Sequence, residues 1–205
     1  MRLSAVTLFI TGALLSAGCG GSDGAPNLSA TPTLPTSTQT PKPTLSPSRT
    51  GPLTSGPNVK PGETPPALND FAKQHNSAGA LAFATYFIKA LDWSLATSDP
   101  YLLQQISAPS CKSCAAYISR LSQVRTAGQS VVGGRFSIGS ARLRQGAFRF
   151  HSDYIVEMDL IQNSLSITGP GATSPSPISH STRFVSRIYV SWINDRWQII
   201  EQGGS

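Results

Sequence analysis

The apolar residues of this chain change their spacing near residue 131, and this change constrains the fold more than any other feature. Before it, apolar side chains recur every three or four positions, which is typical of amphipathic helices. After it, apolar and polar residues alternate, which is typical of half-buried strands. Helices followed by antiparallel strands predict an α+β domain over residues 67–205, with N-terminal helices packed on a curved antiparallel sheet.

Three helices are expected in the first half of this domain. The first begins near Asn76 or Ser77, because either side chain can cap its free amides. Its apolar stripe consists of Ala80, Phe83, Phe87 and Leu91. A short second helix is expected over 101–106, after a break at a proline, and a third over about 113–127.

Alternating patterns predict several strands in the second half. The residues that share a face in each strand are Phe136 and Ile138, then Tyr154, Val156, Met158 and Leu160, then Phe184, Ile188, Val190 and Trp192. Asn194 and Asp195 separate the last of these strands from another and predict a tight hairpin turn. Residues 164–181 are rich in Pro, Ser and Gly and predict a long exposed loop.

The N-terminal third of the chain has a composition that does not support a packed core. Residues 20–66 are mostly Thr, Ser, Pro and Gly with few large apolar side chains, so burial cannot offset the entropy of ordering them. We expect residues 19–66 to form a lipidated cysteine followed by a disordered stalk. The stalk is interpreted as a passive spacer, with glycosylation or a grip on the cell wall as alternatives.

Residues 1–18 have the pattern of an export signal. Arg2 supplies a positive charge, and an apolar run over 3–15 is too short to span a bilayer as a helix. Small residues then precede Cys19, and this arrangement resembles the bacterial lipobox, with Ser16 where the motif usually has Leu. The resemblance implies cleavage before Cys19 and its lipidation, which tethers the protein to the outer side of the cell membrane. An ordinary secretory signal is the alternative.

A longer set of motifs resembles a known family. The set consists of the lipobox and Thr/Pro-rich stalk, Phe83-Ala84-Thr85-Tyr86-Phe87, Ala90-Leu91-Asp92-Trp93, Ala96-Thr97-Ser98-Asp99, and Ser107 before Cys111-Lys112-Ser113-Cys114. It resembles actinobacterial lipoproteins of domain-of-unknown-function family 6318 over residues 65–201. This resemblance implies an envelope lipoprotein and brings no activity. The element order separately resembles the nuclear transport factor 2-like fold, a cone that often encloses a pocket.

Cys111 and Cys114 are the two cysteines other than Cys19. In an oxidising compartment they are expected to form a structural disulfide that fixes the start of the third helix. A redox pair is the sharper alternative, because a CxxC at a helix start can lower a thiol pKa. A zinc site needs two more ligands, and the three histidines are scattered, so no metal or cofactor is expected.

Tyr86, Asp92 and Trp93 are the candidate pocket residues. Tyr86 and Trp93 are seven residues apart on the first helix and share a face, so both can line a cavity beside Asp92. The plainer interpretation makes the aromatics core residues and leaves Asp92 in solvent or capping a turn. We find no catalytic triad, phosphate-binding loop or glycine fingerprint.

The charge of the chain is modest. Residues 67–205 hold 12 Lys and Arg against 8 Asp and Glu, which is too few for a nucleic-acid surface. Arg142, Arg144 and Arg149 either attract phosphate or lipid headgroups or solubilise an exposed hairpin. The leading hypothesis is a non-enzymatic binding or interaction module of the cell envelope, whose partner is an envelope protein, the cell wall or a small ligand. The alternative is a small-molecule enzyme with a cone-shaped pocket.

Overall fold

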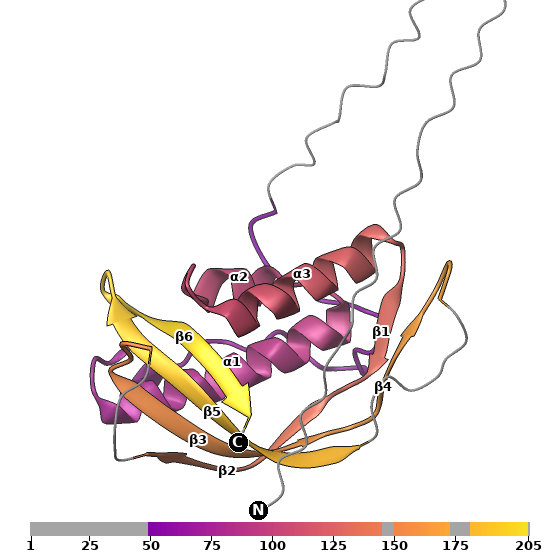
Figure 1. The fold of residues 1–205 in the computed structure, drawn as a ribbon. Helices are drawn as coiled ribbons and strands as arrows, with labels where there is room; N and C mark the ends of the chain where they lie inside the picture. The colour runs from indigo at the N-terminus through magenta and orange to yellow at the C-terminus, as the bar shows by residue number, and fades with distance from the viewer. Residues whose placement is uncertain (1–48, 145–149, 173–180, 205) are drawn as a thin grey trace, which may run out of the picture. The chain divides into compact units, whose positions relative to one another are not determined.

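The computed structural model describes residues 49–144, 150–172 and 181–204, which form the α+β domain drawn in Figure 1. Its first half contains a short 3-10 turn and three α-helices: η1 (Phe71–Lys73), α1 (Ser77–Thr97), α2 (Tyr101–Ile106) and α3 (Lys112–Thr126). Its second half contains β1 (Ser130–Gly133), β2 (Phe136–Leu143), β3 (Tyr154–Gln162), β4 (Leu165–Thr168), β5 (Thr182–Ile193) and β6 (Arg196–Gly204).

The strands form two antiparallel sheets. One has the order β2-β3-β5-β6 and the other pairs β1 with β4. Figure 1 shows α1 lying along the curved four-stranded sheet. The largest fully buried side chains come from both layers and include Phe87, Leu91, Met158, Leu160 and Ile188. The predicted α+β class is therefore confirmed, and the two sheets do not close around the helices.

The predicted element ends agree closely with the structure. Asn76 caps α1, because its side chain accepts a hydrogen bond from the Gly79 amide at 2.8 Å. The helix α3 begins at Lys112, slightly earlier than expected, because Cys111 serves as its cap. Asn194 and Asp195 both have left-handed φ angles, 50° and 58°, as the predicted tight turn between β5 and β6 requires.

The expected loop over residues 164–181 was wrong in its first part. Leu165–Thr168 forms β4, which pairs with β1 in a register that joins Ser130 to Thr168 and Gly133 to Leu165. The segment is short and is followed by Gly and Pro, so its local sequence carries little strand signal. Its hydrogen-bond partners are supplied by a strand more than thirty residues away. Residues 169–172 contain no helix or strand, as expected of a loop, and residues 173–180 lie outside the described residues.

Residues 49–66, which composition assigned to the stalk, pack against the domain. We call them the N-terminal strap. The Asn58 amide donates to the Ala96 carbonyl at 3.1 Å, and the Trp93 indole donates to the Leu53 carbonyl at 2.9 Å. A Cβ on Gly56 would lie 2.5 Å from the Thr97 Cα, so only glycine permits this approach. The expected domain boundary at residue 66 was therefore too late: composition missed it because hydrogen bonds contribute much of the strap's attachment.

Arg135 ties the strap to α1 and to the strands. It lies between β1 and β2 and donates two hydrogen bonds to Asp92, from Nε at 2.9 Å and from Nη2 at 2.7 Å. Its Nη1 reaches the Asn58 carbonyl and Glu63 at 3.0 and 3.1 Å. The hydrogen bonds that Arg135 donates to Asp92 raise the pKa of Arg135 against the opposing effect of burial. Asp92 also accepts the Phe136 amide at 2.8 Å, so both of its oxygens are engaged.

We expect Asp92→Asn to lower the free energy of unfolding by about 2 kcal/mol, because it leaves the shielded Arg135 cation facing a neutral amide. Chemical denaturation at neutral pH measures the difference. Glu63→Gln is the matched control, since it removes a more exposed carboxylate from the same guanidinium. It should cost less than about 1 kcal/mol. Equal losses for the two variants would contradict a central role for Asp92.

Candidate functional site

A pocket lined mainly by apolar and aromatic side chains lies between the β5–β6 hairpin and the entry to α1. Its volume is about 260 Å³, and we call it the tryptophan pocket. Its walls are formed by Leu68, Ala72, Phe83, Ile106, Trp192 and Trp197. Its polar lining consists of Lys73, Gln105, Asp195 and Arg196. An apolar cavity with a few polar groups at its edge is the usual form of a small-molecule site.

Packing and hydrogen bonding fix the tryptophan side of this pocket. Trp197 is 3% exposed, and its indole donates to the Gln74 carbonyl at 3.0 Å. Trp192 makes an edge contact with Trp197, with ring centroids 5.1 Å apart. His75 stacks on Trp192 at 4.6 Å with an interplanar angle of 7°. These contacts restrict the rings before any ligand arrives, which reduces the entropy that binding must overcome.

The turn that precedes α1 depends on Gly79. A Cβ at this position would lie 1.9 Å from the Gln74 carbonyl oxygen, so no other residue fits without moving the backbone. The same carbonyl accepts the Trp197 indole. Gly79 therefore allows the turn to lie close enough to the helix to hold one wall of the tryptophan pocket.

The rim of the tryptophan pocket carries one guanidinium without an ion-pair partner among the described residues. Lys73 pairs with Asp70 at 2.9 Å, so these two charges offset each other. Asp195 occupies the hairpin turn, and Arg196 follows it. Arg196 is exposed and has no ion-pair partner among the described residues. A ligand with a negatively charged group would find a guanidinium here that is free to bind it.

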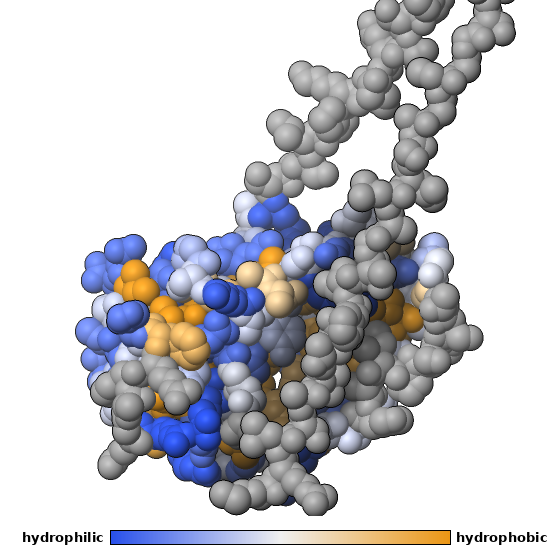
Figure 2. Space-filling model, in the orientation of Figure 1, coloured by the Kyte–Doolittle hydropathy of each residue, from blue (hydrophilic) through white to orange (hydrophobic). Residues whose placement is uncertain are grey.

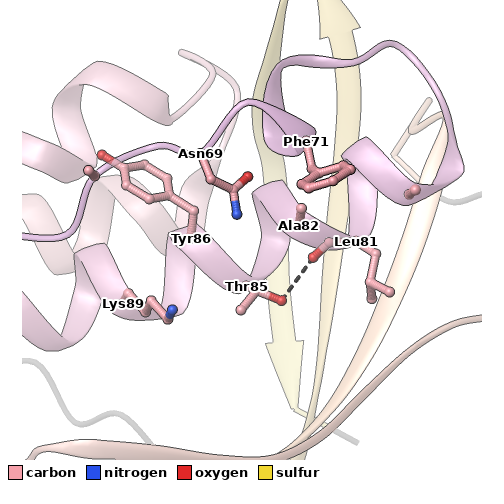
Figure 3. A pocket seen from close by; sticks show the side chains of 9 residues that line it. Asn69, Phe71, Leu81, Ala82, Thr85, Tyr86 and Lys89 are labelled. Atoms are coloured by element: carbon pink, nitrogen blue, oxygen red, sulfur yellow. Dashed lines mark hydrogen bonds between the residues drawn. The ribbon is translucent and has the colours of Figure 1, made fainter.

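The structure does not bring Tyr86, Asp92 and Trp93 into one pocket. Tyr86 is half-buried in a separate groove of about 370 Å³ on the outer side of α1, and burial raises its pKa. Figure 3 shows this groove, to which the segment before α1 contributes Asn69 and Phe71. Trp93 is only 4% exposed and is bonded to the strap. Tyr86 therefore lines one space, whereas Asp92 and Trp93 border another.

Asp92 is partly buried, and both of its carboxylate oxygens accept hydrogen bonds. It lines a hollow with Glu63, Trp93 and Arg135, and its carboxylate is held by Arg135. The aromatic pocket that the structure does contain was missed from the sequence. The sequence feature that could have indicated this pocket is the pair Trp192 and Trp197. The two residues flank the predicted hairpin turn and lie opposite each other in the strand register.

The cysteine pair lies at the start of α3. The sulfur atoms of Cys111 and Cys114 are 2.01 Å apart, a disulfide-bonding distance, and both residues are 1% exposed. Glu201 of β6 accepts the free amides of Lys112 and Ser113 at 3.1 and 3.0 Å. A buried pair next to a capped helix start favours the structural interpretation over redox exchange. Cys19 and the signal sequence lie outside the described residues.

No group of three His, Cys, Asp or Glu side chains that could hold a metal ion is found among the described residues. Within the same part of the chain, no helix has both the length and the hydrophobicity needed to cross a membrane. Hydrophilic residues cover much of the face drawn in Figure 2, with separate apolar patches between them. The exposed large apolar side chains are Phe71, Val132, Phe150 and Ile161.

A family model described as a family of unknown function, DUF6318, matches residues 58–203. The chain belongs to this family. The matched DUF6318 region includes the strap from Asn58 onward, the cysteine pair and the tryptophan pocket. No curated protein matches the chain.

Solved structures also resemble this DUF6318 member. The intermembrane space region of the chloroplast protein ARC6 is similar, with 12% sequence identity and a TM-score of 0.47. The likeness covers 64% of this chain and 97% of that one. It leaves the function of the chain open.

Glu201→Gln should lower the free energy of unfolding by about 1 kcal/mol at neutral pH, because a neutral amide caps α3 less well. Burial acts to raise the pKa of Glu201, but hydrogen bonds from Ser113 and nearby amides outweigh it and lower the pKa below 4.5. Because the pKa of Glu201 is lower in the folded protein than in the unfolded chain, its carboxylate stabilises the fold fully at pH values above the unfolded pKa. This stabilisation is lost as the pH falls through the folded pKa. Denaturation of both proteins across acidic pH should show their difference shrinking below about pH 4.5, whereas a constant difference would contradict the assigned cap.

Proposed function

We propose that this chain is a membrane-anchored, extracytoplasmic lipoprotein that binds a small ligand in the cell envelope without transforming it. The tryptophan pocket is the observation that carries the proposal. It is apolar, its aromatic walls are fixed by packing, and its rim offers an unpaired cation at Arg196. These properties suit a ligand with a flat apolar part and an anionic group.

Binding is favoured over catalysis by the groups that surround this pocket. Asp195 is the only carboxylate among its described lining residues, and it lies on an exposed turn. Asp92, the other candidate acid, is committed to Arg135. A general acid or base needs a free group within reach of the ligand. The small-molecule enzyme therefore remains the less supported alternative.

The anchor is supported by the sequence. The apolar run over 3–15 and the small residues before Cys19 suit cleavage and acylation, and a diacylglyceryl group would hold the protein stably. We further propose an actinobacterial origin from the family motifs. We also propose a nuclear transport factor 2-like fold, which is supported by helices that precede a sheet curved along α1.

The ligand class is tested by NMR of the indole N–H groups, using phenylacetate as the probe. The chain has three tryptophans, and Trp93 is sealed under the strap, so it serves as an internal control. We expect phenylacetate to shift the Trp192 and Trp197 signals and to leave Trp93 unchanged. Uniform shifts, or none with any aromatic acid tried, would rule out the pocket as the site.

Arg196→Gln should weaken phenylacetate binding about tenfold, because it removes one charge-assisted hydrogen bond. Arg120→Gln is the matched control: it removes an exposed cation on α3 and should leave the affinity unchanged. Phenylacetamide, which has no charge, should bind the unmodified protein about as weakly as phenylacetate binds the Arg196 variant. Equal affinity for the acid and the amide would argue against an anionic ligand.

Cys19→Ser should release the protein from membranes. In an actinobacterial host, the unmodified protein is expected in the membrane fraction, with mass spectrometry showing an acylated Cys19 as the first residue. The serine variant cannot accept a lipid and should be found outside the membrane fraction. Recovery of unmodified protein that still carries Met1 and lacks an acyl group would refute the anchor while leaving the pocket untouched.

A further inference from the structure

The outer face of the four-stranded sheet, turned away from α1 (Figure 1), carries three arginines around one carboxylate. Glu157 on β3 accepts hydrogen bonds from Arg142 on β2 and from Arg187 on β5, the latter at 3.3 Å. Arg144 lies 3.5 Å from the same carboxylate. Arg142 and Arg144 are 61% and 46% exposed, so their guanidinium groups also face solvent.

The single negative charge of Glu157 does not neutralise the three arginines around it. Each guanidinium has about five N–H donors, far more in total than one carboxylate can accept. Burial acts to raise the pKa of Glu157, but hydrogen bonds from Arg187 and Arg142 outweigh it and keep the pKa below its ordinary value. The ionised carboxylate therefore holds the arginines together and leaves two positive charges uncompensated.

The other charged residues on the outer face of the sheet reduce this positive charge but do not reverse its sign. Asp159 accepts a hydrogen bond from the Ser140 hydroxyl, and Asp153 accepts the Trp192 amide at 2.7 Å near the hairpin end. Arg183 on β5 is exposed and adds a further cation. Four arginines against three carboxylates leave one positive charge around Glu157. Glu201, opposite Tyr189 in the register, is bound by the first amides of α3.

An exposed aromatic side chain lies beside the arginines. Phe150 is 53% exposed, and its ring makes a T-shaped contact with the ring of Tyr189, with centroids 4.9 Å apart. Tyr189 is two residues from Arg187 on β5, so the two side chains share a face. Phe150 and His151 have φ angles of 59° and 54°, a left-handed region that non-glycine residues rarely adopt. This unusual backbone holds an apolar ring at the surface.

We propose that Arg142, Arg144, Arg187 and Phe150, which we call the arginine patch, dock on an anionic lipid bilayer. Arginine binds phosphate oxygens in pairs, and an aromatic ring is favoured at the boundary between headgroups and acyl chains. The combination fits phospholipid headgroups better than it fits a soluble anion, which would make no use of Phe150. The contact is separate from the acyl anchor and from the tryptophan pocket.

Vesicle sedimentation tests the proposal, using the chain from residue 19 onward with Cys19→Ser so that no acyl group contributes. The protein should sediment with vesicles that contain phosphatidylglycerol and remain free of vesicles made of phosphatidylcholine alone. Arg142→Gln with Arg144→Gln should weaken binding roughly 10- to 30-fold, because each cation near an anionic surface contributes measurably. Phe150→Ser should weaken it about tenfold.

The matched control removes two cations elsewhere, with Lys112→Gln and Arg120→Gln on α3, and should bind like the parent protein. Both side chains are exposed and have no ion pair among the described residues. Equal losses in both double variants would reduce the effect to net charge and overturn the assignment. The lipid assignment would also fail if the protein bound purified wall polymer but not vesicles. It would fail as well if glycerol phosphate, at the same concentration as the lipid, displaced the protein from the vesicles.

Discussion

The ion pair between Asp92 and Arg135 joins segments that are far apart along the chain. Asp92 lies on α1, Arg135 precedes β2, and the same guanidinium reaches Asn58 and Glu63 in the strap. The carboxylate also accepts the amide that starts β2. This partly buried ion pair thereby fixes where β2 begins relative to α1. The later strands pair onto β2 in turn, so the ion pair also helps to position the β5–β6 hairpin that builds the tryptophan pocket.

A second junction lies just past the C-terminal end of α1. Asp99 is 4% exposed and accepts hydrogen bonds from Arg49 at 2.6 Å and from Arg125 of α3 at 3.0 Å. The strap is thus pinned at Asp99 and at Arg135 before it leaves α1 and turns through η1. Residues 67–73 then line both the tryptophan pocket and the Tyr86 groove. The shape of both spaces therefore depends on how tightly the strap is held.

Local patterns predicted the helices, their caps and the β5–β6 turn, because each depends on side chains within a few residues of one another. Asn76 and the Asn194-Asp195 turn are such cases. The strap and β4 were not predictable in this way, since partners thirty or more residues away supply many of their hydrogen bonds. The ion-pair partner of Asp92 was not predictable for the same reason. Its position on the helix indicated a polar group near the aromatics, but nothing local identified Arg135 as its partner.

The strand β5 links the two proposed surfaces. Ile188 and Trp192 point toward the helices, where Trp192 lines the tryptophan pocket, whereas Arg187 and Tyr189 point outward beside Phe150. Because side chains alternate along a strand, the proposed ligand side and the proposed lipid side lie back to back across one layer of backbone. A domain docked through the arginine patch would therefore keep its pocket on the face away from the bilayer. Lipid contact and ligand entry would then not compete, so the two proposed roles are compatible in one domain.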